Sequence, residues 1–220
     1  MRIRLMPAAF ALALALAGCG VPDPEAANSA PATTEGSAVT TASSWVVLST
    51  PADCAAPITV PTLPAVIPGE AEIDPATGLH VTGAPLEVDL TTYRLEVTGL
   101  VDRPLSLTYE ELRCLPKVEA SPPLDCPGYF VDEVTWAGVP LREILERAEI
   151  RDGATRVRLT AADGYALEVD LTPETLQSAF LAYEVQGETL PALHGFPVRF
   201  VWPDHEGFYW VKWLVRIEVR

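Results

Sequence analysis

Alternation of apolar and polar residues predicts several β-strands between residue 93 and the end of the chain. The clearest case is 93–101, YRLEVTGLV, which alternates regularly and is rich in β-branched residues. Residues 154–171 alternate on both sides of Asp163-Gly164, a turn dipeptide, and therefore predict a hairpin. Other strands are expected at 134–136, within 179–190, where the strand ends in a glycine turn, and on both sides of 203–207, PDHEG, in a strand–turn–strand unit.

Three short segments instead carry the signals of helices. Residues 106–115, SLTYEELRCL, begin with Ser and Thr and continue with two glutamates, as a capped helix does. A glycine turn at Gly138 separates a strand from a second helix, 140–148, whose first residue is a proline. Residues 172–179, TPETLQSA, predict a third helical turn that is capped by its threonine. Because strands outnumber these short helices, the pattern predicts an α+β fold with mixed β-sheet.

The first 18 residues have the composition of a secretory signal peptide. Arg2 and Arg4 precede an apolar run that is too short to span a bilayer and that ends in small residues. The tetrapeptide 16–19, LAGC, resembles a bacterial lipobox. The resemblance implies cleavage before Cys19, lipidation of that cysteine (palmitate), and an exported protein anchored at the outer face of the cell membrane. The alternative is a soluble secreted protein with an incidental cysteine.

Composition divides the remainder of the chain into three parts. Residues 19–44 are rich in Ala, Ser, Thr and Pro without apolar periodicity, which predicts a flexible stalk behind the lipidated cysteine. Residues 45–80 space their apolar residues with prolines, so we expect an extended segment that lies against the folded part. Residues 81–220 then form one domain of ordinary size.

The charge of the chain excludes some partners. Its formal net charge is −15, and removal of residues 1–18 takes away two arginines, which leaves 13 basic and 30 acidic residues, or −17. Such a surface repels nucleic acid and anionic lipid headgroups, and a small anion could bind only in a local basic pocket. Segment 194–214, HGFPVRFVWPDHEGFYWVKWL, could form one, because it holds two of the three histidines, three of the five tryptophans, an arginine and a lysine.

Three cysteines remain after Cys19, so an exported chain would keep one free thiol. Cys54 can pair with Cys114 where the proline-rich segment meets the domain, or Cys114 can pair with Cys126, twelve residues away. The first pairing leaves Cys126 free, at a strand end before a Pro-Gly turn, where its thiol can point into a cleft. Zinc ligation is not indicated, because the chain has few histidines and none of the usual ligand spacings.

Four segments carry a common pattern when they are taken in order: YRLEVTGLVDRPLSLTYEEL, LDCPGYFVDEVTWAGVPLREIL, FLAYEVQGETLPALHGFPVRFVWP and GFYWVKWLVRIEV. Together they resemble the molybdopterin-binding domain of the sulfite oxidase family. Its most specific parts are HGFPVR and VKWL, with thirteen residues from Arg199 to Lys212, and the resemblance covers roughly residues 85–220. It implies a sulfite-oxidase-like fold and an oxidoreductase that holds Mo-molybdopterin.

The resemblance also implies the roles of individual residues. Cys126 stands in the place of the catalytic cysteine that ligates molybdenum, and a thiolate is a suitably soft ligand. Asp163 either matches a further pterin contact or only shapes its turn. Arginine offers phosphate a planar fork and lysine a point charge. The residues implied to hold the pterin and its phosphate are His194, Arg199, Trp210, Val211 and Lys212.

The chain departs from the family pattern in two places that concern the site. Residues 80–95, HVTGAPLEVDLTTYRL, offer few side-chain donors where the family has an Asn- or Arg-His-bearing segment. Positions that carry arginines in sulfite-oxidising members hold Phe130, Val131 and Tyr209 here. An anion such as sulfite would therefore lack its counter-charges, which favours a neutral oxygen acceptor of the sulfoxide or N-oxide type.

A third departure concerns export. Family members that leave the cytoplasm with their cofactor generally use a twin-arginine signal, whereas this chain begins MRIRLM. Two functions are therefore expected as alternatives. The first is a molybdenum-dependent oxidoreductase that transfers an oxygen atom to or from a small neutral substrate, takes electrons from a separate carrier, and is a lipid-anchored monomer. The second is a cofactor-free lipoprotein module that keeps the fold to bind a ligand or a protein.

Overall fold

A six-stranded antiparallel sheet forms one layer of the part of the chain described by the computed structural model, residues 46–48, 54 and 56–220. The signal peptide, the stalk and Cys19 lie outside the described residues, so the predictions made for them stay predictions. The strands run in the order β1-β4-β7-β10-β11, with β12 also paired to β10. Their bounds are β1 Val46–Leu48, β4 Lys117–Ala120, β7 Trp136–Pro140, β10 Phe180–Val185, β11 Glu188–Thr189 and β12 Arg199–Val201.

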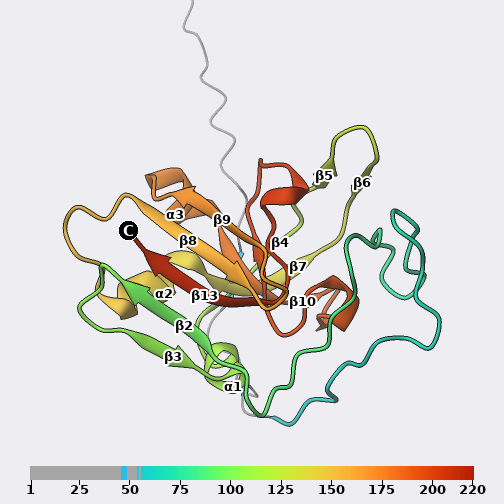
Figure 1. Cartoon of the computed structure of the whole chain (residues 1–220), viewed down its shortest axis with the longest axis horizontal. Helices are drawn as coiled ribbons and strands as arrows, with labels where there is room; N and C mark the ends of the chain where they lie inside the picture. Colours follow the sequence, from blue (N-terminus) through green and yellow to red (C-terminus); the bar gives the residue numbers. More distant parts are fainter. Residues whose placement is uncertain (1–45, 49–53, 55) are drawn as a thin grey trace, which may run out of the picture. The chain divides into compact units, whose positions relative to one another are not determined.

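A second sheet has five strands in the order β3-β2-β13-β8-β9 (Figure 1). Only the pair of β2 and β13 is parallel among these described strands, so the fold is α+β with mixed sheet, as its pattern predicts. A separate hairpin of two short strands, β5 Leu124–Cys126 and β6 Phe130–Asp132, projects from the sheets in Figure 1. The bounds in the second sheet are β2 Leu95–Gly99, β3 Leu105–Leu107, β8 Arg156–Ala161, β9 Ala166–Asp170 and β13 Leu214–Val219.

The three predicted helices form, and all three contact β7. Thr108 and Glu111 make a reciprocal capping box, because each side chain accepts a hydrogen bond from the other residue's backbone N–H. Thr172 caps the third helix by accepting from the N–H of Thr175 at 3.1 Å. The helices are α1 Tyr109–Arg113, α2 Leu141–Ala148 and α3 Pro173–Ser178, and two 3-10 turns are η1 Ala192–His194 and η2 Gly207–Tyr209.

The predicted turn at Gly138 is wrong, because Gly138 lies inside β7, a strand that is buried along its whole length. There it pairs with Ala182 of β10, and a Cβ on Gly138 would overlap the carbonyl oxygen of Leu181. Gly138 is therefore needed for the close approach of two central strands, which is a common reason for a glycine within a strand.

The two strands predicted around PDHEG at the end of the chain form, but they do not pair with each other. β12 belongs to the first sheet and β13 to the second, so residues 202–213 connect two sheets. Three of the described backbone hydrogen bonds tie the two sides of this connection together, from Phe200 to Val211, from Leu214 to Val198 and from Trp213 to Gly195. The basic and aromatic residues of 194–214 consequently lie at the junction between the sheets.

The proline-rich segment is tied to the folded part at several points. The disulfide joins Cys54 to Cys114 and leaves Cys126 as a free thiol, and Arg113 donates a hydrogen bond to the carbonyl of Ala56 at 2.9 Å. Further along, residues 69–83 fold back on themselves, with backbone hydrogen bonds of 2.8 Å from Ala71 N–H to the carbonyl of Val81 and from Val81 N–H to the carbonyl of Glu72. We call this the 69–83 hairpin. No described helix is long and apolar enough to cross a membrane.

Replacing Gly138 by alanine should destabilise the protein by about 2 kcal/mol or more, because the buried strands must move apart to admit the methyl group. The free energy of unfolding, measured with urea, tests this. The control is Gly153→Ala, at a turn with φ +88° where a Cβ meets no atom within 4 Å, which should cost only about 1 kcal/mol of backbone strain. Equal losses for the two variants would contradict the role given to Gly138.

Candidate cofactor site

The free thiol of Cys126 lies at the end of β5, where the chain turns toward β6. Tyr129 N–H closes this turn on the carbonyl of Cys126 at 3.0 Å, and Gly128 adopts φ +82°. The sulfur packs against Gly207 of η2, where a Cβ would stand 2.6 Å from it. Burial raises the pKa of Cys126, Arg199 opposes that shift, and nearby carboxylates add to it. The thiol therefore has space and exposure to act as a ligand, but it needs a cation to hold it as a thiolate.

Two cavities meet at this part of the molecule. We call them the cysteine cavity, of about 370 Å³, and the arginine cavity, of about 250 Å³. Both are bordered by Thr82 and Phe208, so they adjoin. The cysteine cavity is lined by Glu70, Ala71, Thr82, Cys126, Pro127, Tyr129, Phe130 and Phe208. The arginine cavity is lined chiefly by Gly83, Asp163, Tyr165, Arg199, Trp210 and Lys212.

Arg199 is a buried cation with no carboxylate partner among the described residues. The residue is only 5% exposed. Its guanidinium carbon lies 5.1 Å from the ring centre of Trp136 and 5.8 Å from that of Trp210. Its one protein hydrogen bond is a long one, 3.4 Å to the carbonyl of His194, and its Nε has no partner. Burial lowers its pKa to about 10. A buried donor without a partner is costly, so this arrangement is suited to receive an anion.

Lys212 brings a second positive charge to the arginine cavity. Its Nζ donates to the carbonyls of Thr82 and Leu193 and lies 4.4 Å from the ring centre of Trp213. Burial and the neighbouring Arg199 lower the pKa of Lys212 to about 7, while Glu70 and Asp163 oppose that shift. Its charge therefore depends on pH near neutrality and on whether an anion is bound beside it.

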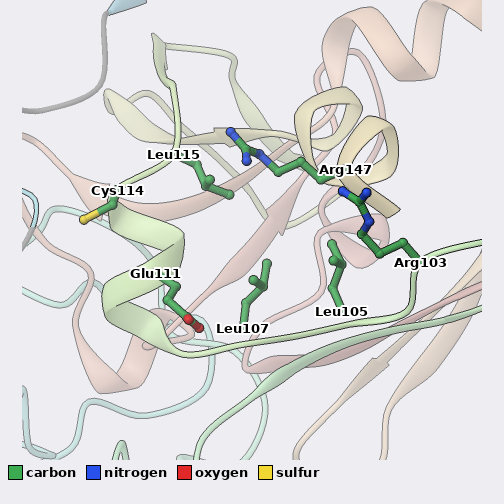
Figure 2. A pocket seen from close by; sticks show the side chains of 7 residues that line it. All are labelled: Arg103, Leu105, Leu107, Glu111, Cys114, Leu115 and Arg147. Atoms are coloured by element: carbon green, nitrogen blue, oxygen red, sulfur yellow. The ribbon is translucent and has the colours of Figure 1, made fainter. Parts of the chain in front are cut away.

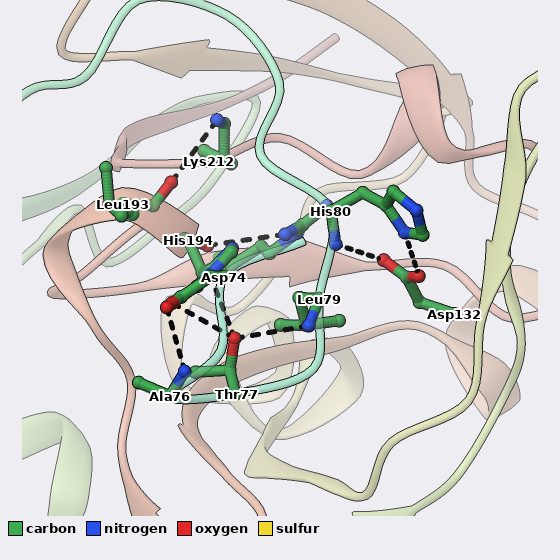
Figure 3. Close-up of polar contacts among 10 residues, drawn as sticks. Asp74, Ala76, Thr77, Leu79, His80, Asp132, Leu193, His194 and Lys212 are labelled. Atoms are coloured by element: carbon green, nitrogen blue, oxygen red, sulfur yellow. Dashed lines mark hydrogen bonds and ion pairs between the residues drawn. The ribbon is translucent and has the colours of Figure 1, made fainter. Parts of the chain in front are cut away.

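His194 is engaged by the 69–83 hairpin rather than by either cavity. Its Nε2 lies 2.9 Å from Oδ2 of Asp74 and 3.1 Å from the hydroxyl of Thr77, as Figure 3 shows. Burial lowers the pKa of His194 to about 4 although Asp74 opposes it, so the ring is neutral at physiological pH. A neutral ring that donates from Nε2 to a carboxylate keeps Nδ1 as an acceptor. A contact between His194 and a cofactor would therefore use Nδ1.

A second contact fixes the same hairpin beside Cys126. Asp132 of β6 accepts hydrogen bonds from the backbone N–H of His80 at 2.8 Å and from its ring Nδ1 at 2.6 Å (Figure 3). The ring of His80 stacks on Phe130, with 4.1 Å between ring centres. The 69–83 hairpin is thus held at both of its sides, and it supplies residues to both cavities.

The other implied site residues divide into two groups. Trp210 and Asp163 border the arginine cavity with Arg199 and Lys212, although Asp163 also accepts from Tyr165 N–H at 2.9 Å and so shapes its turn. Val211 is buried and lines neither cavity, and its carbonyl accepts from Phe200 N–H at 2.8 Å. The sequence reasoning missed Asp74 and Thr77; the only local signal was the turn-forming stretch DPATG.

A third cavity, of about 350 Å³, shares no residue with this site (Figure 2). It has an apolar floor that includes Leu105 and Leu107. Its two arginines, Arg103 and Arg147, form ion pairs of 2.9 Å and 2.8 Å with glutamates. Their charges are already compensated, in contrast to that of Arg199.

A family model described as the oxidoreductase molybdopterin-binding domain matches residues 81–220. The chain belongs to this family. The expected resemblance to the molybdopterin-binding domain of the sulfite oxidase family is thereby confirmed. Among the described residues, no group of three or more His, Cys, Asp or Glu is suited to hold a metal ion.

Similar proteins of known name share this domain. An uncharacterized oxidoreductase of Bacillus subtilis, YuiH, is 34% identical over 143 residues, which cover 64% of this chain and 71% of that protein. Sulfite oxidase of Arabidopsis thaliana is 30% identical, with 61% of this chain and 44% of that protein covered. In Azospira oryzae a putative protein-methionine-sulfoxide reductase subunit, YedZ1, is 31% identical, with 58% and 49% covered. The chain thus spans about half the length of the last two.

The fold agrees with this membership. The crystal structure of the sulfane dehydrogenase SoxCD from Paracoccus pantotrophus matches with a TM-score of 0.59 and 25% identity, over 70% of this chain and 44% of that one. The prediction of a sulfite-oxidase-like α+β fold is confirmed. The residues present also fit molybdopterin, because a free thiol and an unpartnered buried guanidinium border adjoining cavities.

If Arg199 awaits an anion, sulfate should stabilise the cofactor-free protein through it. At a sulfate concentration one hundred times its dissociation constant, the free energy of unfolding should rise by about 2.7 kcal/mol. Arg199→Met should abolish this gain, whereas Arg216→Met, at an exposed position of β13, should keep it. Thermal unfolding in sulfate and in chloride of equal ionic strength measures the difference. A gain that survives in Arg199→Met would contradict the assignment.

The sulfate effect should also depend on pH through Lys212. Sulfate keeps its charge from pH 6 to 9, while Lys212, with a pKa of about 7, loses its proton as pH rises through that range. The stabilisation by sulfate should therefore be largest at pH 6 and decline above pH 7. Without sulfate, the free energy of unfolding should instead rise with pH. From pH 7 to about 10.5 the unfolded chain binds the proton that folded Lys212 has lost. Lys212→Met should remove both dependences, and their persistence would refute them.

Proposed function

We propose that this protein is an oxidoreductase that binds Mo-molybdopterin and transfers an oxygen atom to or from a small substrate with an uncharged reacting group. The observation that carries the proposal is the free thiol of Cys126 in a cavity that adjoins the unpartnered guanidinium of Arg199. A structural cysteine and a structural arginine would not require this arrangement. A cofactor with a metal at one end and a phosphate at the other requires both.

The residues of the chain would divide the binding of the cofactor between them. The Cys126 sulfur would ligate molybdenum, and Arg199 and Lys212 would bind the phosphate. Trp210 covers Arg199 and reduces its contact with water, so its interaction with an anion is stronger than at a surface. His194, held by Asp74, would accept a hydrogen bond at Nδ1. When bound, the molybdenum cofactor supplies the two-electron chemistry of oxygen-atom transfer.

The lining of the cysteine cavity supports an uncharged reacting group. No Arg, Lys or His is among the described residues that border it, and Phe130 occupies a position where an arginine is expected in sulfite-oxidising relatives. A sulfoxide meets these conditions. Its reduction breaks the sulfur–oxygen bond, consumes two electrons and two protons, and gives a thioether and water. The name of the Azospira relative, a putative protein-methionine-sulfoxide reductase subunit, is consistent with this substrate class.

The setting of the protein is part of the proposal. Its LAGC sequence supports a lipid anchor on Cys19 and a place at the outer face of the cell membrane. Electrons would come from a separate redox protein, and the chain would act as a monomer on its tether. The cofactor-free binding module remains the second candidate, because MRIRLM lacks the adjacent arginines expected of a signal for folded cargo.

Elemental mass spectrometry of the protein purified from membranes of its native host should find about one molybdenum atom per chain. Cys126→Ser should lower sulfoxide reduction, assayed with reduced benzyl viologen, by about a hundredfold, an effect of the size known for disturbed metal sites. Cys54→Ser/Cys114→Ser removes sulfur away from the cavity and should keep the activity while folded. Wild-type protein without molybdenum, from cells whose other molybdenum enzymes are loaded, would favour the cofactor-free module.

A further inference from the structure

We propose that the cysteine cavity selects substrates that carry a positive charge beside the uncharged reacting group, such as ammonium-bearing sulfoxides. This inference rests on the proposed function and names the substrate class more closely. Its basis is the combination of one positioned carboxylate, Glu70, with aromatic side chains around the same cavity.

The charged groups near Cys126 on the side of the cysteine cavity are carboxylates. Glu70 borders the cavity itself. The carboxylates of Asp125, Asp132 and Glu206 lie near enough to the sulfur to raise its pKa. The opposing cations, Arg199 and Lys212, border the arginine cavity, where the proposed phosphate would neutralise them. An anion entering the cysteine cavity would meet repulsion, whereas an organic cation would be attracted.

Aromatic rings provide the apolar part of the recognition. Phe130 lies in the wall, and Tyr129 and Phe208 are 82% and 56% exposed, so they form a rim that solvent reaches. A quaternary or protonated ammonium group is stabilised over such ring faces, and its alkyl groups also leave water. Exposed aromatics of this size at a cavity mouth are typical of a binding surface. An inorganic anion gains nothing from them.

Glu70 is held in place before any substrate arrives. Its Oε2 accepts a hydrogen bond from Gly83 N–H at 2.9 Å, across the 69–83 hairpin. That hairpin is fixed by Asp74 on His194 and by His80 on Asp132, as Figure 3 shows. A carboxylate that is held by a backbone N–H of the same hairpin loses little freedom when it binds a cation. Its ion pair with the cation is therefore stronger.

Three matched aryl methyl sulfoxides test the inference. Their para substituents are trimethylammonium, its uncharged isostere tert-butyl, and carboxylate. With holoenzyme and reduced benzyl viologen, we expect kcat/KM for the cation to exceed that of the isostere by about fivefold and the carboxylate to be poorest, since exposed cation–π and ion pairs have this size. Raising the salt concentration should reduce the preference.

Variants identify the residue responsible. Glu70→Gln should lower the ratio of kcat/KM for the cation to kcat/KM for the isostere by about threefold, because the isostere carries no charge for Glu70 to attract. Glu72→Gln is the matched control, because Glu72 belongs to the same hairpin and accepts a backbone N–H, from Gly69 at 2.8 Å, without bordering the cysteine cavity. Equal kcat/KM for the three sulfoxides, or a ratio that Glu70→Gln leaves intact, would overturn the inference.

A binding measurement separates this inference from the proposed function. Isothermal titration of cofactor-free protein with the trimethylammonium and tert-butyl compounds reports recognition without turnover. If no sulfoxide is reduced but the cation binds more tightly and Glu70→Gln removes the difference, the proposed reaction fails and the cation site stands. If sulfoxides are reduced and neither kinetics nor binding distinguishes the compounds, the reaction stands and the cation site is refuted.

Discussion

The site is organised around a positive charge that the protein buries without a carboxylate. Arg199 extends from β12, lies near the rings of both Trp136 and Trp210, and keeps its Nε free of any protein acceptor among the described residues. The aromatic faces offset part of the cost of removing the guanidinium from water, but they do not supply an acceptor. A neighbouring carboxylate would complete the charge balance within the protein and remove the reason for an external anion to bind. The arginine cavity is therefore suited to an anion, which would lie next to the adjoining cysteine cavity.

The 69–83 hairpin completes the site although it lies almost wholly before the matched domain, which begins at residue 81. Asp74 binds His194, His80 binds Asp132, and Lys212 donates to the carbonyl of Thr82. These contacts join the hairpin to three separate parts of the domain. Segment 80–95, which was expected to offer few side-chain donors, shares only residues 80–83 with this hairpin. The polar groups of the hairpin hold His194, Asp132 and Lys212 in place. It therefore contributes to the site mainly by fixing other residues.

Local signals in the sequence predicted the local structure well. The caps at Thr108 and Thr172 and the turn at Asp163-Gly164 depend on neighbours within a few residues, so they can be read from the sequence. The role of Gly138 was predicted wrongly because the atom that excludes a side chain there, the carbonyl oxygen of Leu181, is distant in the sequence. The pairing of the last two strands was predicted wrongly because distant strands determine the sheet to which each belongs. Arg199, Lys212 and Cys126 were found through the family resemblance. The bond of Asp74 to His194 spans 120 residues and has no local signal.

The short turn η2 illustrates how such a site can change over evolutionary time. Gly207 touches the Cys126 sulfur, Phe208 borders both cavities, and Trp210, just after the turn, covers Arg199. Any side chain at 207 would push the sulfur away, and a smaller residue at 210 would expose the guanidinium. Position 208 alone faces solvent over more than half of its surface. Exchange of the residue at 208 could therefore change what the cysteine cavity accepts, while Gly207 and Trp210 keep the surroundings of Cys126 and Arg199 unchanged.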